Sequence, residues 1–328
     1  LDIVGQSLEQ LEELQSAVSE LMAGGIRQVV LLGMGGSSMG PEVLRETFGQ
    51  QPGFVELLVL DSTDPAQIGT VEAAVTFEQT AFIVASKSGS TLEPNILKAY
   101  FYQRMVEAVG AEQAAAHFIA ITDPESAVEQ AARKDGYRFI FHGVPEIGGR
   151  FSALSNFGVV PAAVIGIDCR RFLENAQQMV SACAVTTAAD NPGVLLGCIL
   201  GVATLNGRDK LTFIASPQVA SMGAWLEQLI AESTGKQGKG VLPLDGEPVG
   251  SPEVYGDDRV FVYLRHDGTA DAEQDRAVEQ LEQDGQPVIR IDMSDVCNVG
   301  QEMFRWEIAT AVIGSLINVN PFDQPDVE

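Results

Sequence analysis

Short apolar runs alternate with longer segments of helical spacing along the first half of the chain. A short, continuous run rich in β-branched residues predicts a strand that is buried on both faces, as in a parallel sheet. The predicted strands are residues 28–32, 55–60, 81–85, 118–121 and 138–141, and the predicted helices between them are residues 41–48, 91–109 and 126–134. This alternation is typical of a doubly wound α/β domain.

A second series of the same kind follows the Gly148-Gly149 pair. Its predicted strands are residues 211–215, 260–264 and 288–291, and a closing helix is predicted at residues 302–319, with Phe304, Ile308, Ala311, Val312, Ser315 and Leu316 as its apolar positions. The sequence therefore predicts an α/β fold of two doubly wound parallel-sheet domains, each with three α/β/α layers. We place the first domain at residues 1–147 and the second at residues 148–328.

The composition restricts the choice of partners. The chain has 328 residues and 45% hydrophobic content, which suits two cores at roughly 100–200 residues per domain. A formal net charge of −25 disfavours nucleic-acid binding, which needs a basic surface to replace counterions. The longest apolar stretches, residues 159–167 and 194–205, are shorter than the roughly 20 residues that span a bilayer, and no signal sequence is evident. We expect a cytoplasmic protein without nucleic-acid or membrane partners.

The cysteines and the chain ends add two smaller expectations. The four cysteines are scattered without a C-x-x-C pair, so free thiols are favoured over disulfides or a zinc site. The chain begins at Leu1 and stops at Glu328, close to a motif described below. This favours a segment of a longer protein.

A glycine-rich turn follows the first predicted strand, at residues 33–40. Glycines let the backbone approach a ligand, and the following helix offers free N–H groups. The turn alone is a weak signal, because a dinucleotide loop and an ordinary strand-to-helix connection both remain open. Ser38 stands where the G-x-G-x-x-G pattern has its last glycine.

A second turn follows the third predicted strand and carries several hydroxyls and a lysine. Its polar residues are Ser86, Lys87, Ser88, Ser90 and Thr91. Hydroxyls donate to phosphate oxygens, the N-terminus of a helix attracts anions, and Lys87 adds a positive charge. An ordinary helix cap explains one hydroxyl but hardly four. Together the two turns favour a phosphorylated metabolite over a nucleotide.

These turns and three later segments resemble the phosphoglucose isomerase family. The matching segments, in the family's order, are residues 33–37, 86–91, 148–152, 228–236 and 320–324. Residues 225–236 and 252–259 are most similar to the isomerase part of bacterial transaldolase/phosphoglucose isomerase fusions. The resemblance implies two sugar-isomerase domains, a homodimer, possible fusion to a transaldolase, and a metal-free, cofactor-free interconversion of glucose 6-phosphate and fructose 6-phosphate.

The resemblance also implies a role for each matching residue. Ser86, Ser88, Ser90 and Thr91 hold the phosphate with Lys87 nearby, and Gly36, Ser37, Gln228 and Gln324 contact the substrate. Arg150 faces the reacting carbons, and Glu232 is the base that moves a proton between C1 and C2.

An aldose–ketose isomerisation requires these residue types for chemical reasons that do not depend on the resemblance. One carboxylate can accept a proton from one carbon and return it to the next through an enediol intermediate, and a guanidinium stabilises charge on the oxygens. Gln228 and Glu232 are four residues apart in a predicted helix, so they share one face. Taken alone, Glu232 is better interpreted as an exposed helix-end carboxylate and Arg150 as part of a surface ion pair. The set of motifs reverses that preference.

Two parts of the family's pattern are missing. The histidine that opens the sugar ring has no counterpart in residues 246–256, where Glu253 is a guess from spacing, and the catalytic lysine would follow Glu328. His117, His142 and His266 are not convincing substitutes. The alternatives are an isomerase for another phosphosugar, a regulatory module that binds a sugar phosphate without turnover, and, more remotely, a dinucleotide dehydrogenase.

Overall fold

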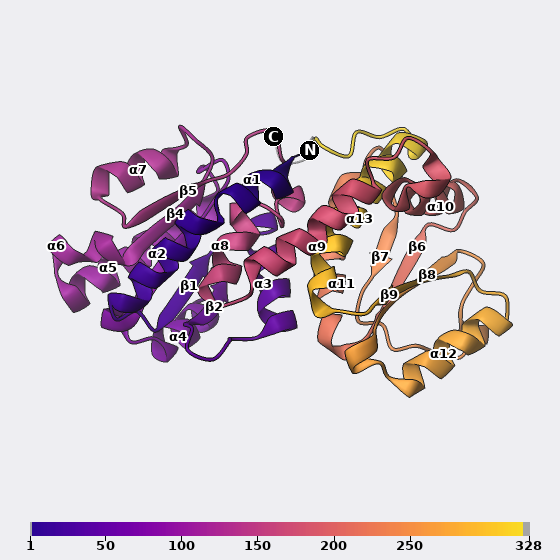
Figure 1. The fold of residues 1–328 in the computed structure, drawn as a ribbon, viewed down its shortest axis with the longest axis horizontal. Coiled ribbons are helices and arrows are strands. Elements are labelled where there is room, and N and C mark those ends of the chain that lie inside the picture. Colours follow the sequence, from indigo (N-terminus) through magenta and orange to yellow (C-terminus); the bar gives the residue numbers. More distant parts are fainter. Residues whose placement is uncertain (1, 324–328) are drawn as a thin grey trace. The chain divides into compact units, whose positions relative to one another are not determined.

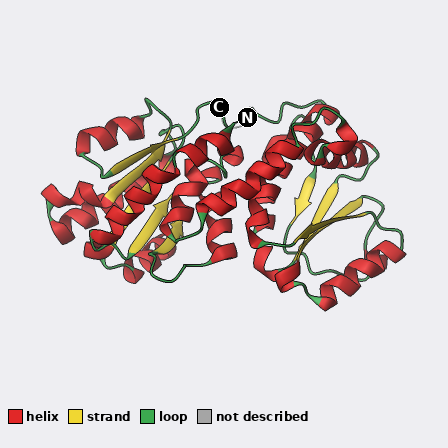
Figure 2. Cartoon of the chain, viewed as in Figure 1, coloured by secondary structure: helices red, strands yellow, loops and turns green. Residues whose placement is uncertain are grey.

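The computed structural model of the chain describes residues 2–323. Contacts within the chain define two compact units, Leu1–Arg170 and Arg171–Glu328. Helices cover both faces of a sheet in each unit (Figures 1 and 2). The predicted domain boundary after residue 147 lies earlier than this division, and it stays a prediction. We describe each unit by itself.

The first unit contains one sheet and the helices that cover it. Its strands are β1 Gln28–Leu32, β2 Glu56–Leu60, β3 Thr80–Ala85, β4 Phe118–Thr122 and β5 Phe139–His142. Its helices are α1 Ile3–Glu9, α2 Leu11–Ala23, α3 Gly36–Phe48, α4 Pro65–Ala74, α5 Leu92–Val109, α6 Ala111–Ala114, α7 Ala127–Asp135 and α8 Asn156–Val164, and 3-10 turns are η1 Phe77–Gln79, η2 Ala115–His117 and η3 Gly149–Phe151. The five predicted strands are confirmed.

The sheet of the first unit is parallel, with the strand order β2-β1-β3-β4-β5. The chain leaves β1 toward β2 on one side and later returns as β3 on the other. Ligands of doubly wound folds bind at such a switch point, outside the carboxyl ends of the strands. The connections after β1 and β3 are therefore the positions at which this topology favours a site.

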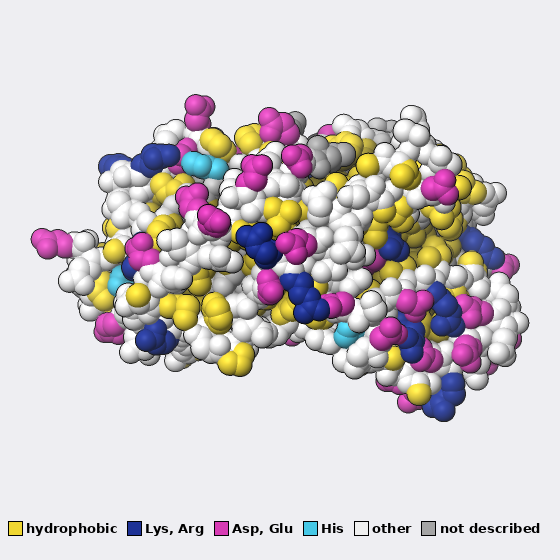
Figure 3. Space-filling view, viewed as in Figure 1, with side chains coloured by type: hydrophobic (Ala, Val, Ile, Leu, Met, Phe, Trp, Pro, Cys, Tyr) yellow, Lys and Arg dark blue, Asp and Glu magenta, His cyan; other side chains and the backbone are white. Residues whose placement is uncertain are grey.

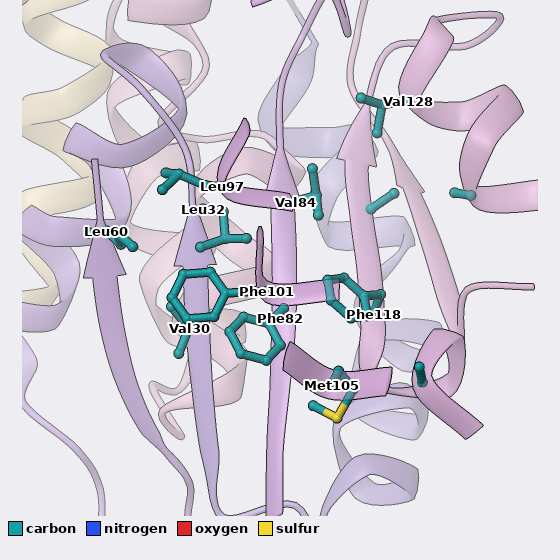
Figure 4. Packing of buried hydrophobic residues seen from close by; sticks show 13 residues of the cluster. Val30, Leu32, Leu60, Phe82, Val84, Leu97, Phe101, Met105, Phe118 and Val128 are labelled. Atoms are coloured by element: carbon teal, nitrogen blue, oxygen red, sulfur yellow. The ribbon is translucent and has the colours of Figure 1, made fainter. Parts of the chain in front are cut away.

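Large aromatic side chains fill the core between the sheet and α5 (Figure 4). The ring of Phe82 on β3 stacks on Phe101 of α5 at 4.8 Å and on Phe118 of β4 at 5.3 Å between centroids. All three side chains are fully buried. This packing fixes α5 over β3 and β4, and thus the place of its N-terminus.

Helix α7 begins with side-chain caps from Ser126 and Glu129, arranged much as in a capping box. Ser126 accepts a hydrogen bond from the backbone N–H of Glu129, while the carboxylate of Glu129 accepts one from the N–H of Glu125 at 2.5 Å. The same carboxylate accepts from His142 Nε2 at 2.8 Å and from Arg133 Nε at 3.0 Å. These hydrogen bonds lower the pKa of Glu129 to about 2, and the bond from His142 makes the largest contribution.

The second unit repeats the arrangement with a smaller parallel sheet of strand order β7-β6-β8-β9. Its strands are β6 Lys210–Ala215, β7 Leu242–Leu244, β8 Arg259–His266 and β9 Val288–Met293. Its helices are α9 Cys169–Ala182, which begins at the division, α10 Pro192–Leu205, α11 Met222–Thr234, α12 Ala272–Gln283 and α13 Val299–Ile317, with 3-10 turns η4 Ala188–Asp190, η5 Pro217–Val219, η6 Pro252–Val254, η7 Asp267–Thr269 and η8 Val296–Asn298. Strand β7 escaped prediction because it is short and contains Pro243.

Helix α13 is apolar on two sides for two different reasons. Its side toward the sheet buries Met303, Trp306, Ile313 and Ile317. Its predicted apolar positions Ile308, Val312 and Leu316 instead contact α10, where they meet Gly193, Gly197 and Gly201. Glycines at this spacing let the two helix backbones come close. The sequence pattern had therefore identified the contact with α10 rather than the core face.

Among residues 2–323, no helix is both long and apolar enough to cross a membrane.

The bonds of Glu129 predict a pH dependence of stability. Because the folded pKa of about 2 lies below the ordinary 4.5, this carboxylate contributes stability above about pH 4.5 that is lost as the pH falls toward 2. We expect Glu129→Gln to flatten the fall in unfolding free energy between these values. Urea titrations across that range measure it, with the exposed Glu112→Gln as the control that keeps the wild-type profile. An unchanged profile in Glu129→Gln would contradict the assignment.

Candidate active site

Three hydroxyls lie exposed where the chain passes from β3 to α5. Ser88 Oγ and Ser90 Oγ are 2.8 Å apart, and Ser88 Oγ accepts a hydrogen bond from the N–H of Ser90 at 3.2 Å. Thr91 is the N-cap of the 18-residue helix α5, and its side chain makes no capping bond. The hydroxyls and the first N–H groups of α5 therefore face the same region, an arrangement that suits an anion.

The loop between β3 and α5 also packs against the start of α7. Gly89 has a φ of +73°, and a Cβ at this position would lie 2.9 Å from the N atom of Val128 and 3.1 Å from that of Ala127. A side chain is excluded both by the backbone conformation and by this contact. Two helix N-termini, those of α5 and α7, are thus brought to one loop.

Ser86 and Lys87 have different surroundings from the exposed hydroxyls. Ser86 is 2% exposed, and its Oγ has no hydrogen-bond partner among residues 2–323. Lys87 Nζ contacts Asp123 Oδ2 at 2.5 Å and donates to the carbonyl of Val144 at 2.8 Å. Lys87 therefore ties the loops after β3, β4 and β5 together, and its positive charge is shared with Asp123.

The glycine-rich turn after β1 contacts the segment that carries Arg150. A Cβ on Gly36 would lie 2.2 Å from the carbonyl carbon of Gly149 and 2.6 Å from the N atom of Arg150. The two backbones can approach in this way because residue 36 has no side chain. Ser37, which follows, is buried, and the hydroxyl of Ser38 donates to the carbonyl of Gly35 at 3.1 Å.

Strand pairing places these features at one edge of the first unit. Leu32 at the end of β1 pairs with Val84 next to the end of β3. The glycine-rich turn, the serine-rich loop and the Arg150 segment therefore meet at the switch point of the sheet. Arg150 is 5% exposed, and its guanidinium lies 5.5 Å from the ring centroid of Phe151. Arg150 is therefore a buried residue rather than a surface one.

The two predicted residues of the second unit share one face of α11, as expected. Gln228 Nε2 donates to Glu232 Oε1 at 3.4 Å. Gln228 is half-buried and Glu232 is exposed in the last turn. Gln228 Oε1 is buried and accepts no hydrogen bond from the described part of the chain.

The loop after α11 is joined to the C-terminal motif by Lys236, a role that the sequence did not reveal. Lys236 is 6% exposed. Its Nζ donates to the carbonyl of Asn320 at 2.6 Å, to Asp323 Oδ1 at 2.7 Å and to the carbonyl of Asp323 at 2.8 Å. The motifs around Glu232 and Asn320 therefore lie side by side. Gln324, the remaining predicted contact, lies outside the described residues.

The three histidines have structural partners. His117 bonds the carbonyl of Thr80, His142 bonds Glu129 and His266 bonds the hydroxyl of Thr269. Glu253 is exposed on η6, and hydrogen bonds from its own backbone and from Ser251 lower its pKa. An ionised, exposed carboxylate is a poor proton donor, which weakens the guess that Glu253 opens the ring.

Acidic and basic side chains are interspersed over the visible face (Figure 3). The net charge of −25 does not prevent a local site from binding an anion, because backbone N–H groups and hydroxyls act at short range.

A family model described as phosphoglucose isomerase matches residues 4–247. The chain belongs to the phosphoglucose isomerase family. The match spans both predicted turns, the Arg150 segment and helix α11. The Asn320 motif lies beyond it.

Individual proteins and structures agree with this family. A glucose-6-phosphate isomerase from Rubrobacter xylanophilus is 28% identical in an alignment that covers 98% of this chain and 84% of that protein. The crystal structure of a hypothetical protein from Thermus thermophilus has a TM-score of 0.88 at 25% identity, covering 100% of this chain and 87% of that one. The crystal structure of a glucose-6-phosphate isomerase from Chlamydia trachomatis shares the fold, with a TM-score of 0.79 at 22% identity and coverage of 98% and 71%.

The contact between Gly36 and the Arg150 segment generates a prediction. Gly36→Ala forces a Cβ into the Gly149 backbone, so we expect a loss of about 1–3 kcal/mol in unfolding free energy and a weaker affinity for a sugar phosphate. Chemical denaturation and calorimetric titration measure the two effects. Gly69→Ala is the control, because a Cβ on Gly69 of α4 meets nothing within 4 Å. Equal stability of the two variants would show that the contact is not tight.

Proposed function

We propose that this member of the phosphoglucose isomerase family interconverts glucose 6-phosphate and fructose 6-phosphate. The observation that carries the proposal is the meeting of the serine-rich loop, the glycine-rich turn and the Arg150 segment at one switch point. A loop with exposed hydroxyls at a helix N-terminus suits the phosphate, and a buried guanidinium suits the charge of an enediolate. The name of the Rubrobacter relative supports the same activity.

For the phosphate, we propose Ser88, Ser90 and Thr91 as direct ligands together with the first N–H groups of α5. Ser86 and Lys87 belong to the same loop, but their contacts favour a supporting role. Ser86 is buried, and the ammonium of Lys87 is already held by Asp123 and Val144. For the rest of the substrate, the proposal retains Gly36, Ser37, Gln228 and Gln324.

For the chemical step, we propose Glu232 as the base and Arg150 as the cation. Glu232 takes the proton from C2 of the open-chain aldose, the C2–H electrons form the C1–C2 double bond, and the π electrons of the C1 carbonyl move to O1, which takes a proton from water to give the enediol. Returning the first proton to C1, with loss of the O2 proton to water as the C2 carbonyl forms, gives the ketose. A carboxylate serves both transfers, because it is basic when ionised and acidic once it holds the proton. The amide of Gln228, bonded to Glu232 at 3.4 Å, orients that carboxylate.

The homodimer and the fused transaldolase remain proposals that rest on the resemblance alone, and the cytoplasmic location remains a proposal that rests on the sequence composition. A regulatory module that binds without turnover is the main competing function, and an isomerase for another phosphosugar is the second. Phosphate binding alone needs neither Arg150 nor Glu232, and their presence favours catalysis.

The base can be tested in the full-length protein with Glu232→Gln. We expect kcat for the two hexose phosphates to fall by about 100-fold or more, because an amide cannot carry the proton, while the Kd of glucose 6-phosphate changes little. A coupled assay measures kcat, and calorimetric titration measures Kd. The neighbouring Glu227→Gln, on an exposed position of α11, is the matched control. Full activity of Glu232→Gln would exclude it as the base, and a wild type that binds without turnover would favour the regulatory module.

The phosphate site can be tested by the double substitution Ser88→Ala with Ser90→Ala. Since a hydrogen bond to a charged group contributes about 1.5–3 kcal/mol, we expect KM for glucose 6-phosphate to rise by about tenfold or more, with little change in kcat. Thr70→Ala is the control, because its hydroxyl donates only to the carbonyl of Ala66 on α4. An unchanged KM in the double variant would remove the loop from the phosphate site.

A further inference from the structure

One carboxylate oxygen of Glu307 on α13 has no hydrogen-bond partner among residues 2–323. This atom, Oε1, is buried, while the residue as a whole is only half-buried. More than about 90% of buried polar groups in proteins have a partner. An acceptor that lacks one indicates that something outside the described chain completes it.

The face of α13 that carries Glu307 points toward the C-terminal motif. Gly314 lies two turns further along the same face, and a Cβ there would be 2.9 Å from Pro321. Pro321 belongs to the segment that Lys236 holds at the end of α11. The other side of α13 is occupied by α10. Glu307 therefore lies on the side where α11 and the C-terminal motif meet.

A second unmet acceptor lies on the neighbouring helix. Helices α11 and α13 pack against each other, and Gln228 Oε1 on α11 is also buried without a donor in residues 2–323. Gln228 in turn bonds Glu232, the proposed base. A ligand with several hydroxyls would supply the donors and acceptors that these groups lack.

The ionisation state of Glu307 differs from that of Glu253. Burial raises the pKa of Glu307 well above its ordinary value, which favours the neutral carboxyl with a proton to donate. The pKa of Glu253 is lowered instead. The three histidines of the chain already form hydrogen bonds with other residues, namely Thr80, Glu129 and Thr269.

We propose that Glu307 is a further catalytic residue of the proposed isomerase, the acid that protonates the ring oxygen when the cyclic hexose phosphate opens. The inference rests on the proposed function. In the step, the bond between the anomeric carbon and the ring oxygen breaks, and its electrons go to that oxygen, which takes the proton of Glu307. The anomeric hydroxyl loses its proton to water as the carbonyl forms. The released carboxylate regains a proton from solvent or in ring closure.

The test compares a cyclic with an open-chain substrate in the full-length protein. Fructose 6-phosphate is largely a furanose, whereas 5-deoxyfructose 6-phosphate lacks the hydroxyl that closes this ring. We expect Glu307→Gln to lower kcat/KM for fructose 6-phosphate by about 100-fold or more and to leave that for the deoxy analogue within about threefold, since general acid catalysis serves only the ring.

Glu302→Gln is the matched control. Glu302 is a second glutamate of α13; it is buried as a whole residue, and burial raises its pKa to about 7. Its Oε1 lies 3.2 Å from Arg305, while its Oε2, like Glu307 Oε1, has no hydrogen-bond partner among residues 2–323. A separation of five residues places Glu302 on a different face of the helix from Glu307. We expect its rates with both substrates to stay within about threefold of wild type, a spread of about 0.65 kcal/mol.

Every outcome of the test decides the proposal. An equal loss with both substrates would assign Glu307 a positioning or structural role, and no loss would remove it from the reaction. If Glu307→Gln does not fold, Glu307→Asp carries the same comparison, because it keeps a carboxyl but withdraws it from the substrate. A wild type that turns over neither substrate overturns the proposed function itself, and the inference with it.

Discussion

The close approach of Gly36 to the peptide between Gly149 and Arg150 is the contact on which the candidate site of the first unit depends. A Cβ at residue 36 would lie 2.2 Å from the Gly149 backbone, so the two segments meet only because residue 36 is glycine. Since Gly36 begins α3 directly after β1, this contact carries a buried arginine to the carboxyl edge of the sheet. Pairing of β1 with β3 then adds the serine-rich loop.

Lys236 has the corresponding function in the second unit. A buried ammonium is tolerated when its charge is paired and its donors are used, and Asn320 and Asp323 supply three oxygen atoms for it. This bond joins the end of α11 to the segment after α13. It thereby sets where Glu232, in the last turn of α11, stands relative to the C-terminal motif.

The polar groups of the interior fall into two classes. Both carboxylate oxygens of Glu129 accept hydrogen bonds, from the N–H of Glu125 and from the side chains of Arg133 and His142. These bonds are the cause of its low pKa. Several other buried side-chain oxygens have no hydrogen-bond partner within the described chain, including those of Ser86, Gln228, Glu302 and Glu307. Proteins tend to break local rules at functional positions. Ser86 and Gln228 lie in family motifs, and Glu307 faces one, so a ligand is expected at these three members of the second class.

Local pattern alone determined much of this protein. Apolar runs located eight of the nine strands in residues 2–323, since a buried parallel strand is marked by its own residues, and the motifs identified the family. The roles of Glu232 and Arg150 stay predictions from those motifs. Strand β7 escaped because it is three residues long and contains proline. The tertiary structure alone decided the pairing of Lys87 with Asp123, the burial of Arg150, the bonds of Lys236 and the unmet carboxyl of Glu307. Each depends on contacts between residues far apart in the sequence, and no local pattern encodes those.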